Sequence, residues 1–255
     1  YDATIISGDI ALAGHPSIPN YFLDTEFCIK YLTNITKKPV YFILGNHDYY
    51  FGSIKETRSI MSSLSKTSNA RWLSDGYVIE LEPDVALIGH DGWYDMRNGT
   101  EVFPFVMTEF EYVKEFDGYR SDFNIAKNLC RDLADESAFY FDTILPMVLE
   151  KYNKVIILTH VPIYTSVCRY RGLEPDEIYY PFYTSQAIGD CLASIASIYK
   201  DKEFLVLCGH THGVADELIL PNLRVMVGGA KYGSPTIQKI ITIENNLISI
   251  NLPNN

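Results

Sequence analysis

Four short apolar segments in this sequence each end in residues that can bind a divalent metal ion. The residues that follow these segments are Gly8-Asp9, Gly45-Asn46-His47-Asp48, Thr159-His160 and Gly209-His210-Thr211-His212. In open α/β sheets, ligands bind just outside the carboxyl ends of the strands, so these four ends should converge on one crevice. Carboxylate, amide and imidazole ligands without thiolates favour Zn, Fe, Mn or related divalent ions. The sequence therefore predicts a metal site.

Each of these residues also has an ordinary structural explanation when it is taken alone. Asp9 follows a glycine and could cap a turn or a helix, and a single histidine such as His160 is more often a core residue. His210 and His212 are a stronger signal, because two histidines spaced by one face a single cavity only where the alternation along a strand breaks. The glycines that flank this pair permit such a break. Together, the four strand ends are hard to explain by packing, and they favour a functional site.

The residues between these ends indicate a chain of alternating strands and helices. Apolar, β-branched runs predict strands at residues 4–7, 40–44, 85–88, 155–158 and 204–207. From Asp216 onward the pattern changes to strands without helices. It ends in a hairpin of residues 237–243 and 247–251 across the turn at Asn245-Asn246. We therefore expect a C-terminal β-meander.

Helical spacing appears in three of the connecting segments. Apolar residues recur every four positions at Leu23, Phe27, Tyr31 and Ile35, and this pattern stops at Lys37-Lys38-Pro39. Residues 121–151 predict two helices, with a kink in the second at Pro146, and residues 185–200 predict another.

Two aromatic segments, residues 94–119 and 163–184, have no clean period. Long irregular excursions in a compact domain usually carry function, so we expect both segments to be substrate-binding insertions in a single domain spanning residues 1–255. In the second segment, Arg169 and Arg171 could bind a phosphate or lie solvated on a loop.

Composition and charge exclude several classes of function. The 255 residues include 47% hydrophobic and 21% charged residues, which is typical of a globular protein. A formal net charge of −11 disfavours a nonspecific nucleic-acid or anionic-membrane partner. The 5 cysteines form no Cys-x-x-Cys pair, which favours a reducing compartment. No segment approaches the roughly 20 apolar residues of a membrane helix, so we expect a cytoplasmic protein.

In this order and on these strand ends, the motifs resemble those of the calcineurin-like metallophosphoesterase family. The matching pieces are Gly8-Asp9, Gly45-Asn46-His47-Asp48, Thr159-His160-Val161-Pro162 and Gly209-His210-Thr211-His212. The resemblance implies an α/β fold in which two mixed β-sheets pack as a sandwich flanked by helices, in α/β/β/α order. It also implies a dinuclear metal centre at the strand ends.

The resemblance assigns a role to each matching residue. It implies that Asp9 bridges two divalent ions such as Mn, Fe or Zn. Asn46, His160 and His210 would complete one ion, and His212 would bind the other. By the same resemblance, His47 would be the general acid near the leaving group, Asp48 would orient it, and Asn46 would also contact the substrate.

One element of the family pattern is absent. The pattern begins with Asp-x-His at the end of a first strand, and these two residues would ligate the second metal. No histidine of this sequence has an aspartate two positions before it. A strand lost from inside a sheet would leave unpaired backbone groups and an exposed apolar face. Since the sequence also begins with a tyrosine, we expect this domain to lack its N-terminal strand.

These observations predict a metal-dependent hydrolase of phosphate monoesters or diesters that uses a metal-activated water. We expect its substrate to be a small molecule or a peptide. Two alternatives stay open. One is a degenerate, non-catalytic scaffold that keeps a metal ion, and the other is a nuclease, which the charge of −11 disfavours. An Asp-x-His upstream of Tyr1 would support catalysis, and its absence would support the scaffold.

Overall fold

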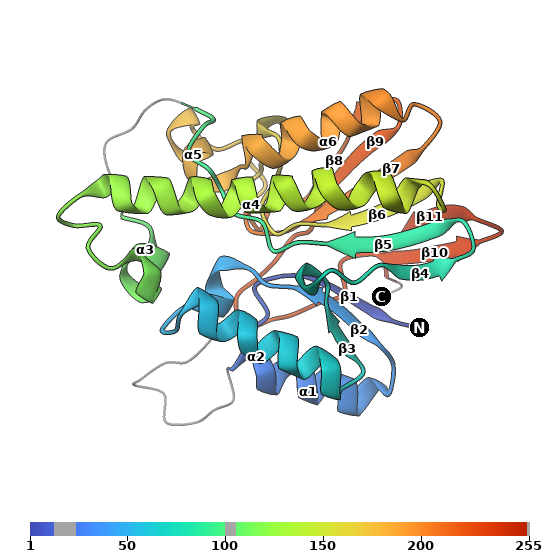
Figure 1. Cartoon of the computed structure of the whole chain (residues 1–255), viewed down its shortest axis with the longest axis horizontal. Helices are drawn as coiled ribbons and strands as arrows, with labels where there is room; N and C mark the ends of the chain where they lie inside the picture. Colours follow the sequence, from blue (N-terminus) through green and yellow to red (C-terminus); the bar gives the residue numbers. More distant parts are fainter. Residues whose placement is uncertain (13–23, 100–105, 254–255) are drawn as a thin grey trace.

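The strands of the molecule pair into three sheets in the computed structural model, which describes residues 1–12, 24–99 and 106–253 (Figure 1). The first sheet is parallel and has the order β1-β2-β3. Its strands are β1 (Thr4–Ser7), β2 (Val40–Ile43) and β3 (Ala70–Trp72). All three are short. Gly8 and Asp9 follow β1, and Leu44, Gly45 and Asn46 follow β2, so polar side chains lie near the carboxyl ends of both strands.

The second sheet has six strands in the order β4-β5-β6-β7-β9-β8. They are β4 (Ile79–Glu82), β5 (Val85–Gly89), β6 (Lys154–Leu158), β7 (Glu203–Cys208), β8 (Ala215–Leu220) and β9 (Leu223–Val227). The four central strands run parallel, and antiparallel strands close both edges. Central strands such as β5 are apolar along their whole length because both faces of the sheet are covered.

The third sheet is the hairpin of β10 (Ile240–Glu244) and β11 (Leu247–Asn251). Asn245 and Asn246 connect the two strands with φ of 51° and 62°, the left-handed pair of a type I′ turn. The hairpin was predicted, but the single C-terminal meander was wrong. β8 and β9 belong to the six-stranded sheet, whereas β10 pairs only with β11 among the described strands. The reason is that β9 has a parallel neighbour available in β7.

Helices cover the outer faces of these sheets (Figure 1). The helices are α1 (Thr25–Thr36), α2 (Ile54–Thr67), α3 (Thr108–Tyr112), α4 (Phe123–Leu149), α5 (Tyr180–Tyr183) and α6 (Gln186–Ile198). α1 and α2 pack on the three-stranded sheet, and α4 and α6 pack side by side on the six-stranded sheet.

A third apolar cluster lies between the sheets and completes the layers. Ile43 and Leu73 from the side of the first sheet meet Leu87, Ile156 and Leu158 from the second. Isoleucines of β10 and β11 pack against the same cluster. The order helix, sheet, sheet, helix confirms the predicted α/β sandwich of two sheets flanked by helices.

Residues 121–151 do not form two helices as predicted. α4 is one helix of 27 residues that continues through Pro146. Proline in a helix interior removes one hydrogen bond and costs about 3 kcal/mol in an isolated helix. Here Phe141, Leu145 and Val148 are buried in the core beneath the helix, and this packing on both sides of the proline keeps the two halves continuous.

The face that α1 buries also differs from the apolar spacing in the sequence. Phe27, Tyr31 and Ile35 lie at the surface, where Tyr31 is 55% exposed, while Ile29 is fully buried. Leu23 lies outside the described residues. Ile29 and Leu32, which are three positions apart, form a second apolar stripe on this helix, and they are the residues that pack into the core. Among the described helices, none is both long enough and apolar enough to cross a bilayer.

Candidate metal centre

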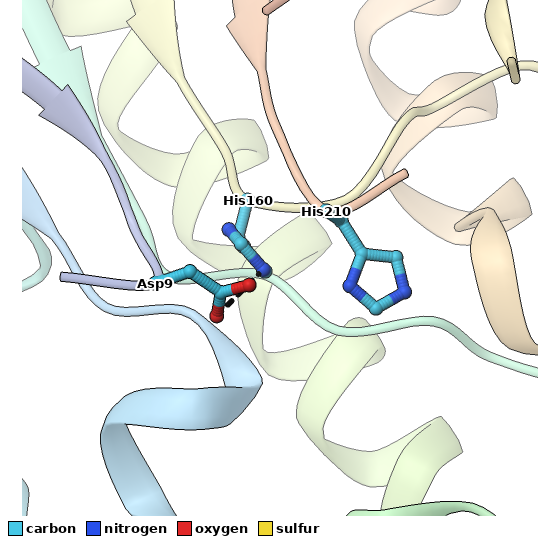
Figure 2. A group of neighbouring side chains, drawn as sticks. All are labelled: Asp9, His160 and His210. Atoms are coloured by element: carbon cyan, nitrogen blue, oxygen red, sulfur yellow. Dashed lines mark ion pairs between the residues drawn. The ribbon is translucent and has the colours of Figure 1, made fainter. Parts of the chain in front are cut away.

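The carboxyl ends of β1, β2, β6 and β7 meet at one edge of the two sheets, and they bring the predicted residues together. Ligand atoms of Asp9, His160 and His210 lie within 4.8 Å of one another, and Figure 2 shows the carboxylate of Asp9 against the ring of His160, with the ring of His210 beside them. Oδ1 of Asn46 lies 3.2 Å from Nε2 of His160 and 3.0 Å from Nδ1 of His210. His160 is 1% exposed and Asn46 is 4% exposed, so the cluster is shielded from solvent.

Two glycines allow the strand ends to come this close. A Cβ atom on Gly8, whose φ is 91°, would stand 2.5 Å from Nδ1 of His160 and 2.7 Å from the backbone N of Gly45. A Cβ atom on Gly45 would overlap Oδ1 of Asp9 and would stand 2.5 Å from Cε1 of His160. The missing side chains therefore make room for the cluster itself.

Three of the candidate ligands have left-handed backbone conformations. Asp9, His210 and His212 have φ of 53°, 67° and 59°. The break in alternation that lets two histidines turn toward one site was predicted at the flanking glycines, but it occurs at the histidines themselves. Gly213 is needed for another reason, since a Cβ there would overlap the backbone of Arg169. Such non-glycine conformations cost about 1–3 kcal/mol each and cluster at functional sites.

A backbone carbonyl fixes the proton position on His160. Nδ1 of this ring lies 2.8 Å from the carbonyl oxygen of Ser7, at the end of β1. A carbonyl oxygen only accepts hydrogen bonds, so Nδ1 carries a proton. In the neutral ring, Nε2 then directs its lone pair at Oδ1 of Asp9 and Oδ1 of Asn46, each 3.2 Å away.

A backbone carbonyl also fixes the proton position on His210, but through the other ring nitrogen. Nε2 of His210 lies 3.0 Å from the carbonyl oxygen of Phe182, and it therefore donates its proton outward. Nδ1 is left to face Oδ1 of Asn46 at 3.0 Å. Outward N–H groups bound to carbonyls are the usual way in which proteins orient metal-binding imidazoles.

The inward-facing atoms are consequently all hydrogen-bond acceptors. Their lone pairs are what a cation requires of its ligands. Burial disfavours charge on His160, but the negative charge of Asp9, together with the hydrogen bonds to Asp9 and to the carbonyl of Ser7, raises the pKa of His160. Burial would likewise raise the pKa of Asp9, but its contacts with His160 hold that pKa below its usual range. Burial, together with the charge of His160, lowers the pKa of His210 to about 3, so this ring stays a neutral ligand.

His212 and His47 lie beside this cluster rather than in it. His212 is half-buried, burial lowers its pKa, and its ring contacts that of Tyr232 at 4.8 Å between centroids. The ring of His47 stacks on Tyr50 at 4.5 Å and lies 5.7 Å from Tyr232. Its backbone N–H donates a hydrogen bond to Oδ1 of Asp9 at 3.1 Å.

Asp48 has different partners from the one that the family resemblance implies. Its carboxylate accepts hydrogen bonds from the backbone N–H groups of Gly45, Ile10 and Ala11, and from the hydroxyl of Thr25. Among the described residues, these partners do not include the ring of His47. Asp48 thus ties the segment after Asp9 to the start of the Asn46 turn. Burial and the charge of Asp9 raise the pKa of Asp48 to about 6.

The two candidate phosphate-binding arginines lie on the loop that adjoins His212. Arg169 donates to the carbonyl oxygen of Cys168 at 2.8 Å and lies 3.7 Å from Glu217. The guanidinium of Arg171 lies 5.2 Å from the ring centroid of Tyr170, which pairs with His212 through a β-bridge. Both arginines therefore have partners within the protein, and their role toward a substrate stays a prediction.

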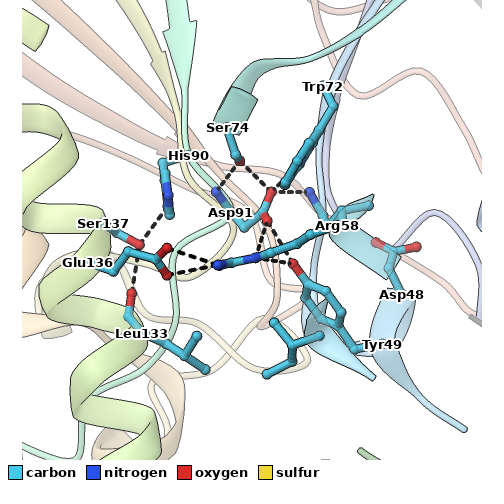
Figure 3. A network of polar contacts seen from close by, with 12 residues as sticks. Asp48, Tyr49, Arg58, Trp72, Ser74, His90, Asp91, Leu133, Glu136 and Ser137 are labelled. Carbon is cyan, nitrogen blue, oxygen red and sulfur yellow. Dashed lines mark hydrogen bonds and ion pairs between the residues drawn. The ribbon is translucent and has the colours of Figure 1, made fainter. Parts of the chain in front are cut away.

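A buried carboxylate behind the cluster was not among the predicted site residues. Asp91, just beyond the end of β5, is 1% exposed and lies at the centre of the network in Figure 3. It accepts hydrogen bonds from Trp72 Nε1 at 2.8 Å, Ser74 Oγ at 2.7 Å, Tyr49 Oη at 2.7 Å and the backbone N–H of Leu44 at 2.8 Å. The His90-Asp91 pair follows an apolar strand like the other sites, and this was its only signal in the sequence.

Arg58 connects this network to the surface. Its Nε lies 3.6 Å from Oδ2 of Asp91, and its Nη1 forms an ion pair of 2.9 Å with Glu136 on α4 (Figure 3). The positive charge of Arg58 offsets the cost of burying the Asp91 carboxylate.

Segment 94–119 was predicted to be a substrate-binding insertion, and residues 100–105 of it lie outside the described residues. The described part packs into the core through Phe110, Val113 and Phe116. It also carries a fully buried carboxylate, Glu109, whose pKa is raised by burial. Sequence reasoning missed Glu109, because a single glutamate in an irregular segment has no spacing that distinguishes it from a surface residue.

Comparisons with known proteins agree with this architecture. The family described as calcineurin-like phosphoesterase matches residues 1–214. A phosphopantetheinyl hydrolase from Mycobacterium tuberculosis superposes with a TM-score of 0.59 at 12% identity, covering 89% of this chain and 79% of that one. A dimetal phosphatase from Danio rerio superposes with a TM-score of 0.54 at 13% identity, covering 89% and 72%. At these identities the likeness shows the fold alone. No curated protein matches the sequence.

Proposed function

This chain belongs to the calcineurin-like phosphoesterase family, and we propose that it hydrolyses phosphate monoesters or diesters at a centre that holds two divalent cations. Membership of the family makes it a metal-dependent phosphoesterase. The observation that carries the proposal is the convergence of acceptor atoms from Asp9, Asn46, His160 and His210, with the ring protons of both histidines directed outward.

We assign the metal ligands from this donor set. Asp9, Asn46, His160 and His210 would hold one cation, and Asp9 with His212 would contribute to a second. When bound, divalent cations of the Mn, Fe or Zn type supply positive charge that acidifies water and attracts phosphate oxygens. Support for two cations comes from the Danio rerio neighbour, because that protein is a dimetal phosphatase.

The chain's own residues perform the remaining tasks in this proposal. His47 lies beside the cluster without belonging to it, so its ring can hold a proton for the departing ester oxygen. Its backbone N–H holds the carboxylate of Asp9 in place. We also keep Arg169 and Arg171 as candidate phosphate contacts, since their loop pairs with the backbone of His212.

The test is hydrolysis of p-nitrophenyl phosphate and bis(p-nitrophenyl) phosphate by the purified protein with added Mn²⁺. We expect activity in the wild type and its loss in Asp9→Asn, which keeps the size of the side chain but removes its charge. Asp216→Asn is the matched control, because Asp216 pairs with Arg224 on the edge strand pair β8 and β9. A protein that binds Mn²⁺ through Asp9 without hydrolysing either ester would support the scaffold alternative instead.

A further inference from the structure

A chain of hydrogen bonds runs from Glu109 to the candidate ligand Asn46. The hydroxyl of Tyr50 donates to Oε2 of Glu109 at 3.0 Å, and the hydroxyl of Tyr94 donates to Oε1 at 2.6 Å. Nδ2 of Asn46 donates to the hydroxyl oxygen of Tyr50 at 2.9 Å. All of these residues are buried, and Glu109 and Tyr94 are fully inaccessible to solvent.

The order of donors along this chain is fixed by the number of protons available. A tyrosine hydroxyl has one proton and can also accept. Because Tyr50 gives its proton to the carboxylate of Glu109, it can only accept from Asn46. The atom of Asn46 that faces Tyr50 must therefore be the amide nitrogen, and the amide oxygen must face His160 and His210.

This orientation matters because the two ends of an asparagine amide have opposite chemistry. The oxygen can ligate a cation. The NH₂ group would instead direct two protons into the cluster and would repel a cation there. Left without a partner, the amide could turn over, since both ends have nearly the same size. Resting on the function proposed above, we propose that Glu109 and Tyr50 are positioning residues that hold the oxygen of Asn46 toward the cation.

A second contact extends the role of Tyr50 to the neighbouring residue. Its ring stacks on His47 at 4.5 Å with an interplanar angle of 27°. One side chain therefore fixes the amide of a candidate ligand and supports the ring of the candidate general acid. Glu109 comes from α3, within the segment that was expected to bind substrate. This part of the segment therefore supports the candidate site through Tyr50 and does not itself contact the cluster.

The chain offers a matched pair of variants to test this proposal. Tyr50→Phe and Tyr94→Phe each remove one hydrogen bond to Glu109 and keep the aromatic ring. Of these two tyrosines, Tyr50 is the one that contacts Asn46. We expect Tyr50→Phe to raise the dissociation constant for Mn²⁺ by about 10- to 100-fold, the usual effect of removing a partner of a metal ligand. We expect Tyr94→Phe to change it by less than about threefold.

Glu109→Gln gives an independent variant of almost the same shape. Tyr50 and Tyr94 donate to different oxygens of Glu109, and glutamine keeps only one of these two oxygens, so in this geometry only one of the two tyrosines can still donate to it. In a fraction of molecules the Tyr50 proton is released toward Asn46 and favours the flipped amide. We expect a weaker Mn²⁺ affinity, by at least about threefold, with the fold retained.

A readout without metal separates this proposal from the proposed function. The readout is hydrogen exchange with solvent, followed by NMR on ¹⁵N-labelled protein with chelator present. The side-chain NH₂ protons of Asn46 should exchange slowly in the wild type and in Tyr94→Phe, and rapidly in Tyr50→Phe. They are identified by their loss in Asn46→Asp. A wild type that binds no Mn²⁺ but shows this pattern would overturn the metal site and leave the positioning role intact. Equal Mn²⁺ affinities in Tyr50→Phe and Tyr94→Phe, or slow exchange in both, would overturn the positioning role.

Discussion

The backbone N–H of Leu44 donates a hydrogen bond of 2.8 Å to Oδ1 of Asp91. The backbone carbonyl of Asp91 accepts another, of 2.9 Å, from the N–H of His160. Leu44 follows β2 in the first sheet and His160 lies just beyond β6 in the second. Asp91 therefore connects the ends of strands from both sheets. This connection holds Asn46 and His160 at the separation that joint binding of a cation requires.

We predict that this carboxylate is a large contributor to stability. Asp91→Ala leaves buried donors on Leu44, Trp72 and Tyr49 without their acceptor. Breaking such a buried charged network costs about 3–5 kcal/mol of unfolding free energy, measured by urea denaturation with chelator present. Glu136→Gln is the control, because Glu136 is 48% exposed and its ion pair with Arg58 should contribute less than about 1 kcal/mol. Equal losses in the two variants would contradict the central role of Asp91.

We predict that divalent metal stabilises the folded protein through the acceptor cluster. At a Mn²⁺ concentration about 100-fold above the dissociation constant, binding adds about 2.7 kcal/mol, which corresponds to a rise in Tm of about 5–10 °C for a chain of this size. The rise is measured by differential scanning fluorimetry against a chelated sample. His160→Ala and His210→Ala should lose it, whereas Glu136→Gln should keep it. A rise that persists in both histidine variants would place the metal elsewhere.

The pH dependence of the unfolding free energy should contain a contribution from His90. This residue is 4% exposed, it is hydrogen-bonded to Ser137 at 2.7 Å, and burial lowers its pKa. The unfolded chain takes up a proton at a pH of about 6.5, while the folded protein keeps the ring neutral to lower pH. The unfolded state then binds more protons, so stability is full above pH ~6.5 and falls as the pH decreases, by up to about 1.4 kcal/mol per pH unit.

The measurement compares unfolding free energies at pH 7.5 and 5.5 with chelator present. His90→Gln should reduce the loss between these two values, because the variant has no proton to take up at this site. Ser137→Ala removes the same hydrogen bond but keeps the buried imidazole. It should lower stability at both pH values and preserve the loss. An unchanged loss in His90→Gln would show that other groups account for it.

Local sequence predicted most of the strands that carry the site, because buried central strands are short, apolar and bounded by glycine or polar residues. β1 matches its predicted range, and β2, β5, β6 and β7 differ by one or two residues at their ends. Features that depend on distant contacts were not predictable. The continuity of α4 through Pro146 depends on the core beneath it, and the buried face of α1 depends on where the sheet lies.

The same distinction applies to the candidate site. Asp9, Asn46, His160 and His210 were found because each follows an apolar strand. Their supporting groups have no such signal. The carbonyl oxygens of Ser7 and Phe182, which set the ring protons of the two histidines, belong to residues whose side chains are irrelevant to that role. Pairings between segments far apart in the chain, such as Glu109 with Tyr50, arise only when the chain is folded.

The last prediction concerns His47, which the structure places beside the acceptor cluster and against the ring of Tyr50. If His47 protonates the leaving group, His47→Gln should slow the hydrolysis of esters with basic leaving groups most, because a departing alkoxide needs the proton and an acidic phenol does not. The rates are measured for a series of aryl phosphates and one alkyl phosphate, and the rate deficit is plotted against leaving-group pKa. We expect a deficit of about 100-fold or more for the alkyl ester and a much smaller one for the most acidic phenol.

Metal content decides whether His47 acts as an acid or as a ligand. His47→Gln should retain as much Mn²⁺ as the wild type, since its side chain lies outside the group formed by Asp9, His160 and His210. His160→Ala should lose Mn²⁺ and slow every substrate by a similar factor, because it removes charge stabilisation that all of the esters share. A His47→Gln variant that loses Mn²⁺ as His160→Ala does would identify His47 as a ligand. A deficit that is independent of leaving-group pKa would rule out proton donation by this ring.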